Sequence, residues 1–100
     1  MPGSALTLKQ LECFLAVEQT LHFRKAAELL GMSQPALTAQ IQNLEDVLSA
    51  QLVERSRSGV ALTPLGREVV SRARDITEGA QSIVDLTRGE KAGLIGTIRL

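Results

Sequence analysis

The sequence predicts a mainly α-helical fold, in which three short helices and a β-hairpin form one small domain and a long helix follows it. Apolar residues recur at helical spacing in four segments, and residues with capping preferences precede these segments. One stretch, residues 52–63, alternates between apolar and polar residues instead. Because aromatic residues make up only 2% of a chain that is 44% hydrophobic, the core is expected to consist of packed aliphatic side chains.

The first two predicted helices are short. Thr7 and Gln10 have the form of a capping box, in which the two side chains satisfy backbone N–H groups at a helix start. Apolar residues at helical spacing follow and predict a helix over about 8–18. A second helix is predicted over 23–30, and Gly31 ends it because glycine adopts the left-handed conformation without steric cost.

The third predicted helix begins after Ser33, an N-cap residue, and carries Pro35 in its first turn, where a missing N–H does no harm. Its buried stripe is defined by apolar residues spaced four, three and four, namely Leu37, Ile41, Leu44 and Leu48. The opposite side consists of Pro35, Ala39, Gln42 and Asp46, with Thr38 and Asn43 on its flanks. These residues are therefore expected to face outward.

A β-hairpin and a long helix complete the predicted fold. Apolar and polar residues alternate in 52–55 and 60–63, on either side of a central segment, 56–59, that contains glycine. This pattern is typical of two strands joined by a turn. Thr63 then serves as an N-cap residue, and Pro64 follows it as the first residue of a helix. Apolar residues continue at helical spacing to about Arg88. Such a helix of roughly 25 residues spans about 37 Å.

These elements divide the chain into three parts. Residues 1–63 form the predicted helix and hairpin domain, and residues 64–89 form the long helix. Residues 90–100 are interpreted as a hinge and the start of a further domain, because Thr97–Leu100 alternates like the beginning of a strand.

The composition excludes several classes of function. One cysteine, Cys13, and one histidine, His22, cannot supply the ligands of a zinc site, and we expect no metal ion and no cofactor in this chain. The sequence contains no catalytic triad, carboxylate pair or phosphate-binding glycine loop, so we expect no enzyme activity. No apolar run reaches the roughly 18 residues of a membrane helix, and the first residues lack the order of a signal peptide, which indicates a cytoplasmic protein.

The net charge of zero opposes nucleic-acid binding, which depends largely on the neutralisation of phosphates. The distribution of charge weakens this objection, because five arginines and only two glutamates lie between residues 49 and 74. The local sign of the charge matters more than the sum.

Two short helices joined by a three-residue turn have the spacing of a helix-turn-helix, which inserts its second helix into the DNA major groove. Ala27 permits a close approach of the helices, Gly31 makes the sharp turn, and Leu37 anchors the second helix on the first. The outward side carries uncharged hydrogen-bonding residues suited to base edges, namely Ser33, Gln34, Thr38 and Gln42. These features predict a winged helix-turn-helix that binds DNA, with the hairpin as its wing.

Several segments of the chain, taken in order, resemble the LysR-type transcriptional regulators. They are Phe23–Leu30, Ser33–Thr38, Ile41–Glu45, Leu52–Arg55 and Leu62–Gly66. The resemblance covers about residues 7–90 and implies a regulator that binds an imperfect palindrome in double-stranded DNA as a homodimer, with a tetramer in the whole protein. It also implies a separate domain that binds a small-molecule or redox effector. The hexapeptide 22–27 is most similar to the peroxide-sensing OxyR branch.

The resemblance implies roles for individual residues. The side chains implied to face the major groove are Ser33, Gln34, Pro35, Thr38, Ala39 and Gln42. Arg55 and Arg57 would lie on or beside the wing, over the DNA backbone and minor groove. Arg24 would hold a phosphate beside the recognition helix.

The chain also departs from the family. Ala39, Gln42 and Ser58 stand where members often carry a basic residue, which lowers the expected phosphate contact and leaves Arg57 as the wing-tip cation. Ser49 stands where glycine is usual after the recognition helix, and a serine held at positive φ costs on the order of 1 kcal/mol.

The long helix carries an apolar stripe that a single small domain cannot cover. Its residues have the four and three spacing of a heptad seam and are Val69, Ala73, Ile76, Ala80, Ile83 and Thr87. Because a rod of about 37 Å outreaches a domain of this size, its distal half is expected to pack on a second copy of the chain.

Two other functions fit part of the pattern. A stand-alone helix-turn-helix repressor or antitoxin would consist of this chain alone, but the strand-like end at 97–100 argues against it. A helical module that binds a protein partner through the long helix, without DNA, would leave the polar face and the arginines of the hairpin without a purpose.

Overall fold

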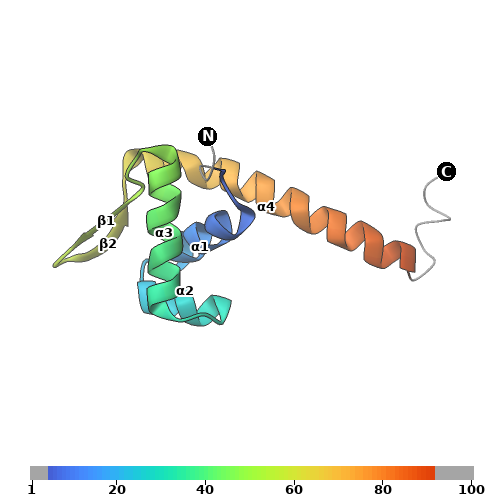
Figure 1. Ribbon diagram of the computed structural model, residues 1–100, viewed down its shortest axis with the longest axis horizontal. Helices are drawn as coiled ribbons and strands as arrows, with labels where there is room; N and C mark the ends of the chain where they lie inside the picture. The colour runs from blue at the N-terminus through green and yellow to red at the C-terminus, as the bar shows by residue number, and fades with distance from the viewer. Residues whose placement is uncertain (1–4, 92–100) are drawn as a thin grey trace.

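The computed structural model describes residues 5–91, with side chains up to residue 89, and contains four helices and one hairpin (Figure 1). The elements are α1 (Leu8–Thr20), α2 (Phe23–Leu30), α3 (Gln34–Leu48), β1 (Val53–Ser56), β2 (Gly59–Leu62) and α4 (Pro64–Lys91). The predicted winged helix-turn-helix followed by a long helix is confirmed. In Figure 1 the hairpin projects from one side of the helical domain, and α4 extends from the other side.

The element boundaries differ slightly from the predicted ones. α1 continues two residues beyond the predicted end, to Thr20, and α4 continues to Lys91. The predicted hinge therefore begins inside a helix, and the strand predicted at Thr97–Leu100 lies outside the described residues. Within residues 5–91, no helix combines the length and the apolar character that a membrane crossing requires.

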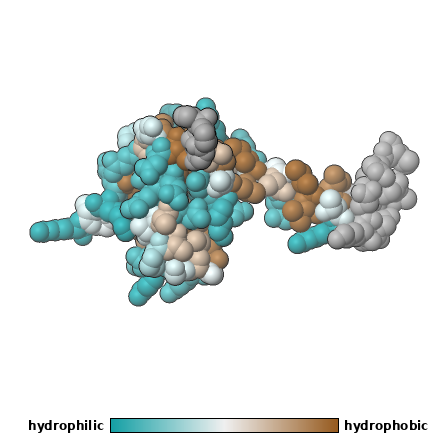
Figure 2. All heavy atoms as spheres, in the orientation of Figure 1, coloured by the Kyte–Doolittle hydropathy of each residue, from teal (hydrophilic) through white to brown (hydrophobic). Residues whose placement is uncertain are grey.

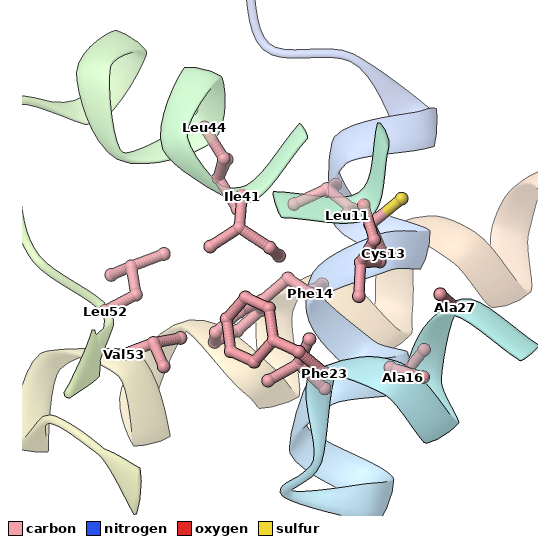
Figure 3. Packing of buried hydrophobic residues seen from close by; sticks show 14 of the residues in the cluster. Leu11, Cys13, Phe14, Ala16, Phe23, Ala27, Ile41, Leu44, Leu52 and Val53 are labelled. Atoms are coloured by element: carbon pink, nitrogen blue, oxygen red, sulfur yellow. The ribbon is translucent and has the colours of Figure 1, made fainter. Parts of the chain in front are cut away.

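The core lies where α1, α2, α3 and the first turns of α4 meet (Figure 3). The largest fully buried side chains are Phe14, Leu37, Leu44, Leu52, Val17 and Cys13. Three of the four residues predicted to form the buried stripe of α3 are buried, namely Leu37, Ile41 and Leu44, whereas Leu48, at the end of the helix, is 37% exposed. Burial raises the pKa of the Cys13 thiol, so that this side chain packs as a neutral group.

Local hydrogen bonds start the helices where the sequence predicts them. The Thr7 hydroxyl accepts a bond from the Gln10 N–H at 3.1 Å, and the Gln10 side-chain oxygen accepts one from the Thr7 N–H at 3.0 Å. Ser33 caps α3, since its hydroxyl oxygen accepts a bond from the Ala36 N–H at 3.2 Å. These bonds satisfy N–H groups that the first turn of a helix leaves without a partner.

Three helices end on a residue in the left-handed region. Gly31 has φ 68° after α2, as predicted, and takes this conformation without strain. Ser49 has φ 51° after α3, which confirms the strain predicted from its replacement of glycine, and Leu21 has φ 51° after α1. Each of these two residues costs roughly 1–2 kcal/mol relative to glycine.

The hairpin is antiparallel and joins its strands through a two-residue turn. Val53 pairs with Leu62 and Ser56 with Gly59, so that Arg57 and Ser58 form the turn. Gly59 has φ 123°, a conformation that favours glycine. The predicted hairpin is thus confirmed, although the glycine is the first residue of β2 and directly follows the two turn residues.

The first half of α4 packs on α1, and the second half extends beyond the domain. Arg74 of α4 forms an ion pair with Glu18 of α1, with its Nη2 atom 3.1 Å and 3.2 Å from the two carboxylate oxygens. Ala73 is only 1% exposed and belongs to the core of the single chain. The prediction of Ala73 as a dimer-seam residue is therefore wrong, because the chain's own core already covers it. Val69 also packs partly against this core.

Gly66 lies in the first turn of α4 against the carbonyl group of Leu52. A Cβ atom at this position would lie far inside the van der Waals distance of the Leu52 oxygen, which is a backbone atom and cannot move aside by changing a rotamer. The approach of α4 to the segment before β1 therefore requires glycine here.

We predict that Gly66→Ala lowers the free energy of unfolding by about 1–3 kcal/mol, because the added methyl group separates α4 from Leu52. Urea denaturation of both proteins measures this difference. Gly79→Ala is the matched control: an added Cβ there meets nothing within 4 Å, and the change should raise stability by roughly 0.5–1 kcal/mol. An equal effect of the two substitutions would contradict the close packing at Gly66.

Candidate nucleic-acid interface

The outward side of α3 forms the floor of a shallow hollow. This hollow has a volume of about 420 Å³, and its lining consists of Gln34, Pro35, Thr38, Ala39 and Gln42. Five of the six residues predicted to face the major groove thus share one continuous surface. The sixth, Ser33, is exposed at the start of the helix but uses its hydroxyl oxygen to cap α3.

A second hollow of about 500 Å³ lies between α2, the start of α3 and the hairpin. It brings together Arg24, Gln34 and Arg55, which come from three different elements. Arg24 is exposed in the first turn of α2, close to the start of α3. The structure therefore places one guanidinium group from the helical domain and one from the hairpin beside the polar surface of α3.

Arg55 is positioned by an aromatic ring. Its guanidinium carbon lies 4.1 Å from the centroid of the Phe23 ring, and Phe23 itself is buried in the core. A cation at this distance is attracted to the ring face. Arg55 therefore lies between the wing and the recognition helix, not at the wing tip, which Arg57 occupies in the turn of the hairpin.

A carboxylate of α3 holds the hairpin in place. One oxygen of Glu45 accepts hydrogen bonds from the backbone N–H groups of Leu52, at 2.7 Å, and Val53, at 3.0 Å. Hydrogen bonds to a charged acceptor are stronger than neutral ones. Glu45 thus fixes the direction in which the wing leaves the recognition helix.

The sequence did not reveal this role of Glu45. The residue was part of the family-like segment Ile41–Glu45, but its partners lie seven and eight positions away across a turn. A single acidic residue on the flank of an amphipathic helix carries no local sign of such a contact. His22 was also missed as a cap: its Nδ1 atom accepts a bond from the Lys25 N–H at 3.2 Å at the start of α2.

The charges around this surface are available to a ligand. The structure contains one ion pair within the described residues, Arg74 with Glu18, and it lies between α1 and α4. Arg24, Arg55 and Arg57 do not take part in it. The surface consequently combines neutral hydrogen-bonding groups at its centre with guanidinium groups around it. This arrangement suits a nucleic acid, in which phosphates carry the negative charge and base edges offer hydrogen-bonding groups.

The same residues are matched by a known protein family. Residues 8–67 match the family described as bacterial regulatory helix-turn-helix protein, lysR family. The chain belongs to the LysR family. EstR, an HTH-type transcriptional regulator of Acinetobacter baylyi, is 40% identical to this LysR-family chain over 94 residues, which are 94% of the chain and 31% of EstR. The chain therefore spans about a third of the length of this relative.

Solved structures of other proteins have the same fold. The DNA-binding domain of BenM in complex with catB site 1 DNA has a TM-score of 0.80 at 36% identity, over 88% of this chain and 95% of that domain. Corynebacterium glutamicum OxyR in its oxidized form has a TM-score of 0.82 at 35% identity, over 85% of this chain and 26% of OxyR. Because these identities are so similar, assignment to the OxyR branch stays a prediction.

We predict that Glu45→Ala lowers the free energy of unfolding by about 1–3 kcal/mol, because two buried N–H groups lose their acceptor. Glu45→Gln should lose less, since an amide oxygen can still accept a bond. Urea denaturation provides the measurement, and Glu54→Ala, at an exposed position of β1, serves as the control with a change within about 0.5 kcal/mol. Similar losses in the Glu45 and Glu54 variants would refute the fixing role of Glu45.

Proposed function

We propose that this LysR-family chain binds double-stranded DNA in a sequence-specific manner and is the DNA-binding part of a transcription regulator. The observation that carries the proposal is the single polar surface of α3, in which Gln34, Thr38 and Gln42 lie side by side with Arg24 and Arg55 close to its start. A regulator of this kind acts on the bacterial chromosome, so we place it in the cytoplasm. It needs no catalytic group.

The central residues of the surface suit direct recognition of bases. The amide groups of Gln34 and Gln42 can each donate to and accept from the edge of an adenine. The Thr38 methyl group and the Pro35 ring can contact thymine methyl groups. Because Asp46 lies near the far end of the same side, only the first turns of α3 should enter the major groove.

The arginines supply contacts that do not depend on sequence. Arg24 and Arg55, which line one hollow at the start of α3, would contact phosphates beside the groove, and Arg57 at the hairpin tip would reach the backbone or the adjacent minor groove. Ala39 and Ser58 add no charge to this set. The affinity should therefore depend more on the three arginines than in relatives with extra basic residues.

The comparisons support DNA binding over the other functions considered. The BenM domain, which matches over most of this chain, has been solved with DNA, and the relatives are named as regulators. A helical module for protein contacts alone would not need the polar surface of α3. DNase footprinting of genomic DNA next to the gene of this protein is the direct test, because protected bases would establish binding and the half-site together.

We further propose that the chain dimerises through the distal part of α4. Ile76 is 48% exposed and Ile83 is 64% exposed, and Figure 2 shows hydrophobic residues along the part of α4 that projects from the domain. With Ala73 removed, the proposed seam consists of Val69, Ile76, Ala80, Ile83 and Thr87, with Val69 at its partly covered end. A two-fold dimer would hold two α3 helices in a fixed relation and favour a palindromic site.

We also propose that the whole protein forms a tetramer and carries a separate domain that binds an effector.

We predict that Gln34→Ala weakens binding to the preferred sequence by about 1–3 kcal/mol and relaxes the choice of base at one position. Arg57→Ala is the contrasting variant, because loss of a wing cation should weaken binding to all sequences and reduce its salt dependence. Fluorescence anisotropy with selected and random duplexes at several salt concentrations separates the two patterns. Equal losses on both duplexes for Gln34→Ala would refute its contact with a base.

We predict that Ile83→Asp gives a folded monomer that binds a full palindrome little better than a half-site, because an unpaired charge would enter the seam. Sedimentation and binding to both duplexes measure the two effects. Ser82→Asp places the same charge at the neighbouring exposed position, off the seam, and should stay dimeric. A dimeric Ile83→Asp variant, or a monomer with full affinity, would overturn the proposed dimer.

A further inference from the structure

The turn of the hairpin presents a hydroxyl group in a basic segment. Ser58 lies in the two-residue turn directly after Arg57, and Arg55 stands three positions before it on β1. All three side chains are exposed. Ser58 contributes nothing to the buried core. An enzyme could therefore reach its hydroxyl without unfolding the domain.

The hydroxyl groups of Ser56 and Ser58 differ in their surroundings. They lie 2.8 Å apart, but the Ser56 oxygen also accepts a bond from the Ser58 N–H at 3.3 Å. Ser56 belongs to β1 and pairs with Gly59, so it closes the turn. Ser58 lies in the turn, outside the strand ladder. Ser56 is exposed as well, but only Ser58 lies in the turn and has an arginine, Arg55, three positions before it.

We propose that Ser58 is a phosphorylation site for a protein serine kinase that selects basic segments, and that its phosphate switches DNA binding off. The effect on DNA rests on the proposed function, whereas the modification does not. Ser58 Oγ attacks the γ-phosphorus of ATP, an O–P bond forms, and the bond from that phosphorus to the bridging oxygen of ADP breaks. The hydroxyl proton passes to a carboxylate of the kinase. Arg55 and Arg57 supply the cations that acidic groups of such a kinase would bind.

The phosphate would reverse the charge of the wing. It adds about −1.5 to −2 charges and three strong acceptor oxygens at neutral pH. Arg57 adjoins Ser58 in sequence and Arg55 lies on the same strand, so either guanidinium group can pair with the phosphate and is then lost to DNA. Loss of about two phosphate contacts, together with repulsion, should lower the affinity for DNA roughly 10- to 100-fold at physiological salt.

The first experiment tests the modification itself. The chain is incubated with ATP, Mg²⁺ and the catalytic subunit of a kinase that selects arginine three positions before serine, which Ser58 has and Ser56 lacks, and intact mass spectrometry counts the phosphates. We expect one phosphate on the unaltered chain and on the matched control Ser56→Ala, and none on Ser58→Ala. Absence of phosphate on the unaltered chain, or incorporation that Ser58→Ala does not change, would overturn the assignment.

The second experiment tests the switch. Binding of the phosphorylated and untreated chains is compared on a duplex selected from random DNA, over a range of salt concentrations. The phosphorylated chain should bind roughly 10- to 100-fold more weakly and with a smaller salt dependence, whereas treated and untreated Ser58→Ala should bind alike. Equal binding of the phosphorylated and untreated chains overturns the switch. Failure of the untreated chain to bind any duplex overturns the proposed function and the switch, but leaves phosphate incorporation at Ser58 unaffected.

Discussion

The backbone of Leu52 connects the three parts on which the proposed interface depends. Its N–H donates to Glu45 of α3, its carbonyl oxygen accepts from the N–H of Thr63, and its side chain is fully buried. Thr63 in turn caps α4, because its hydroxyl oxygen accepts a bond from the Gly66 N–H at 2.9 Å. One peptide segment thus sets the recognition helix, the wing and the long helix relative to one another, and Gly66 provides the space that this segment needs.

Some arginines of the chain stabilise the fold, and others lie on the surface proposed to bind DNA. Arg74 is engaged with Glu18 and holds α4 on α1, and Arg67 donates to the Leu62 carbonyl group. Arg24, Arg55 and Arg57 remain on the side of α3 and the hairpin. A net charge of zero is therefore compatible with a basic surface, since the sum hides which arginines serve the fold and which face outward.

Local features of the sequence were sufficient to predict most of the fold. The caps at Thr7 and Ser33 and the left-handed residue Gly31 act within a few positions, so their partners can be inferred from spacing alone. The residues on the outward side of α3 could be predicted as well, because helical periodicity also depends on spacing alone. Contacts between distant segments were not predictable: periodicity placed Ala73 in a seam, but only the packing of α4 on α1 decides that the single chain buries it. The roles of Glu45 and of Phe23 beneath Arg55 depend on such contacts as well.

Because α4 is attached to the domain only at its N-terminal end, a small rotation there moves its far end by a large distance. Its first turns are fixed by the core and by the ion pair to α1, while 28 residues in one helix reach about 42 Å. A tilt of about 5° at the fixed end would displace the far end of such a rod by roughly 4 Å, which is more than the rise of one base pair. Any force that bends or rotates the distal part of α4 is consequently transmitted to α3 as a change in its position and angle. In the proposed dimer, the spacing between the two α3 helices would then depend on this rod and not on the surface proposed to contact the bases.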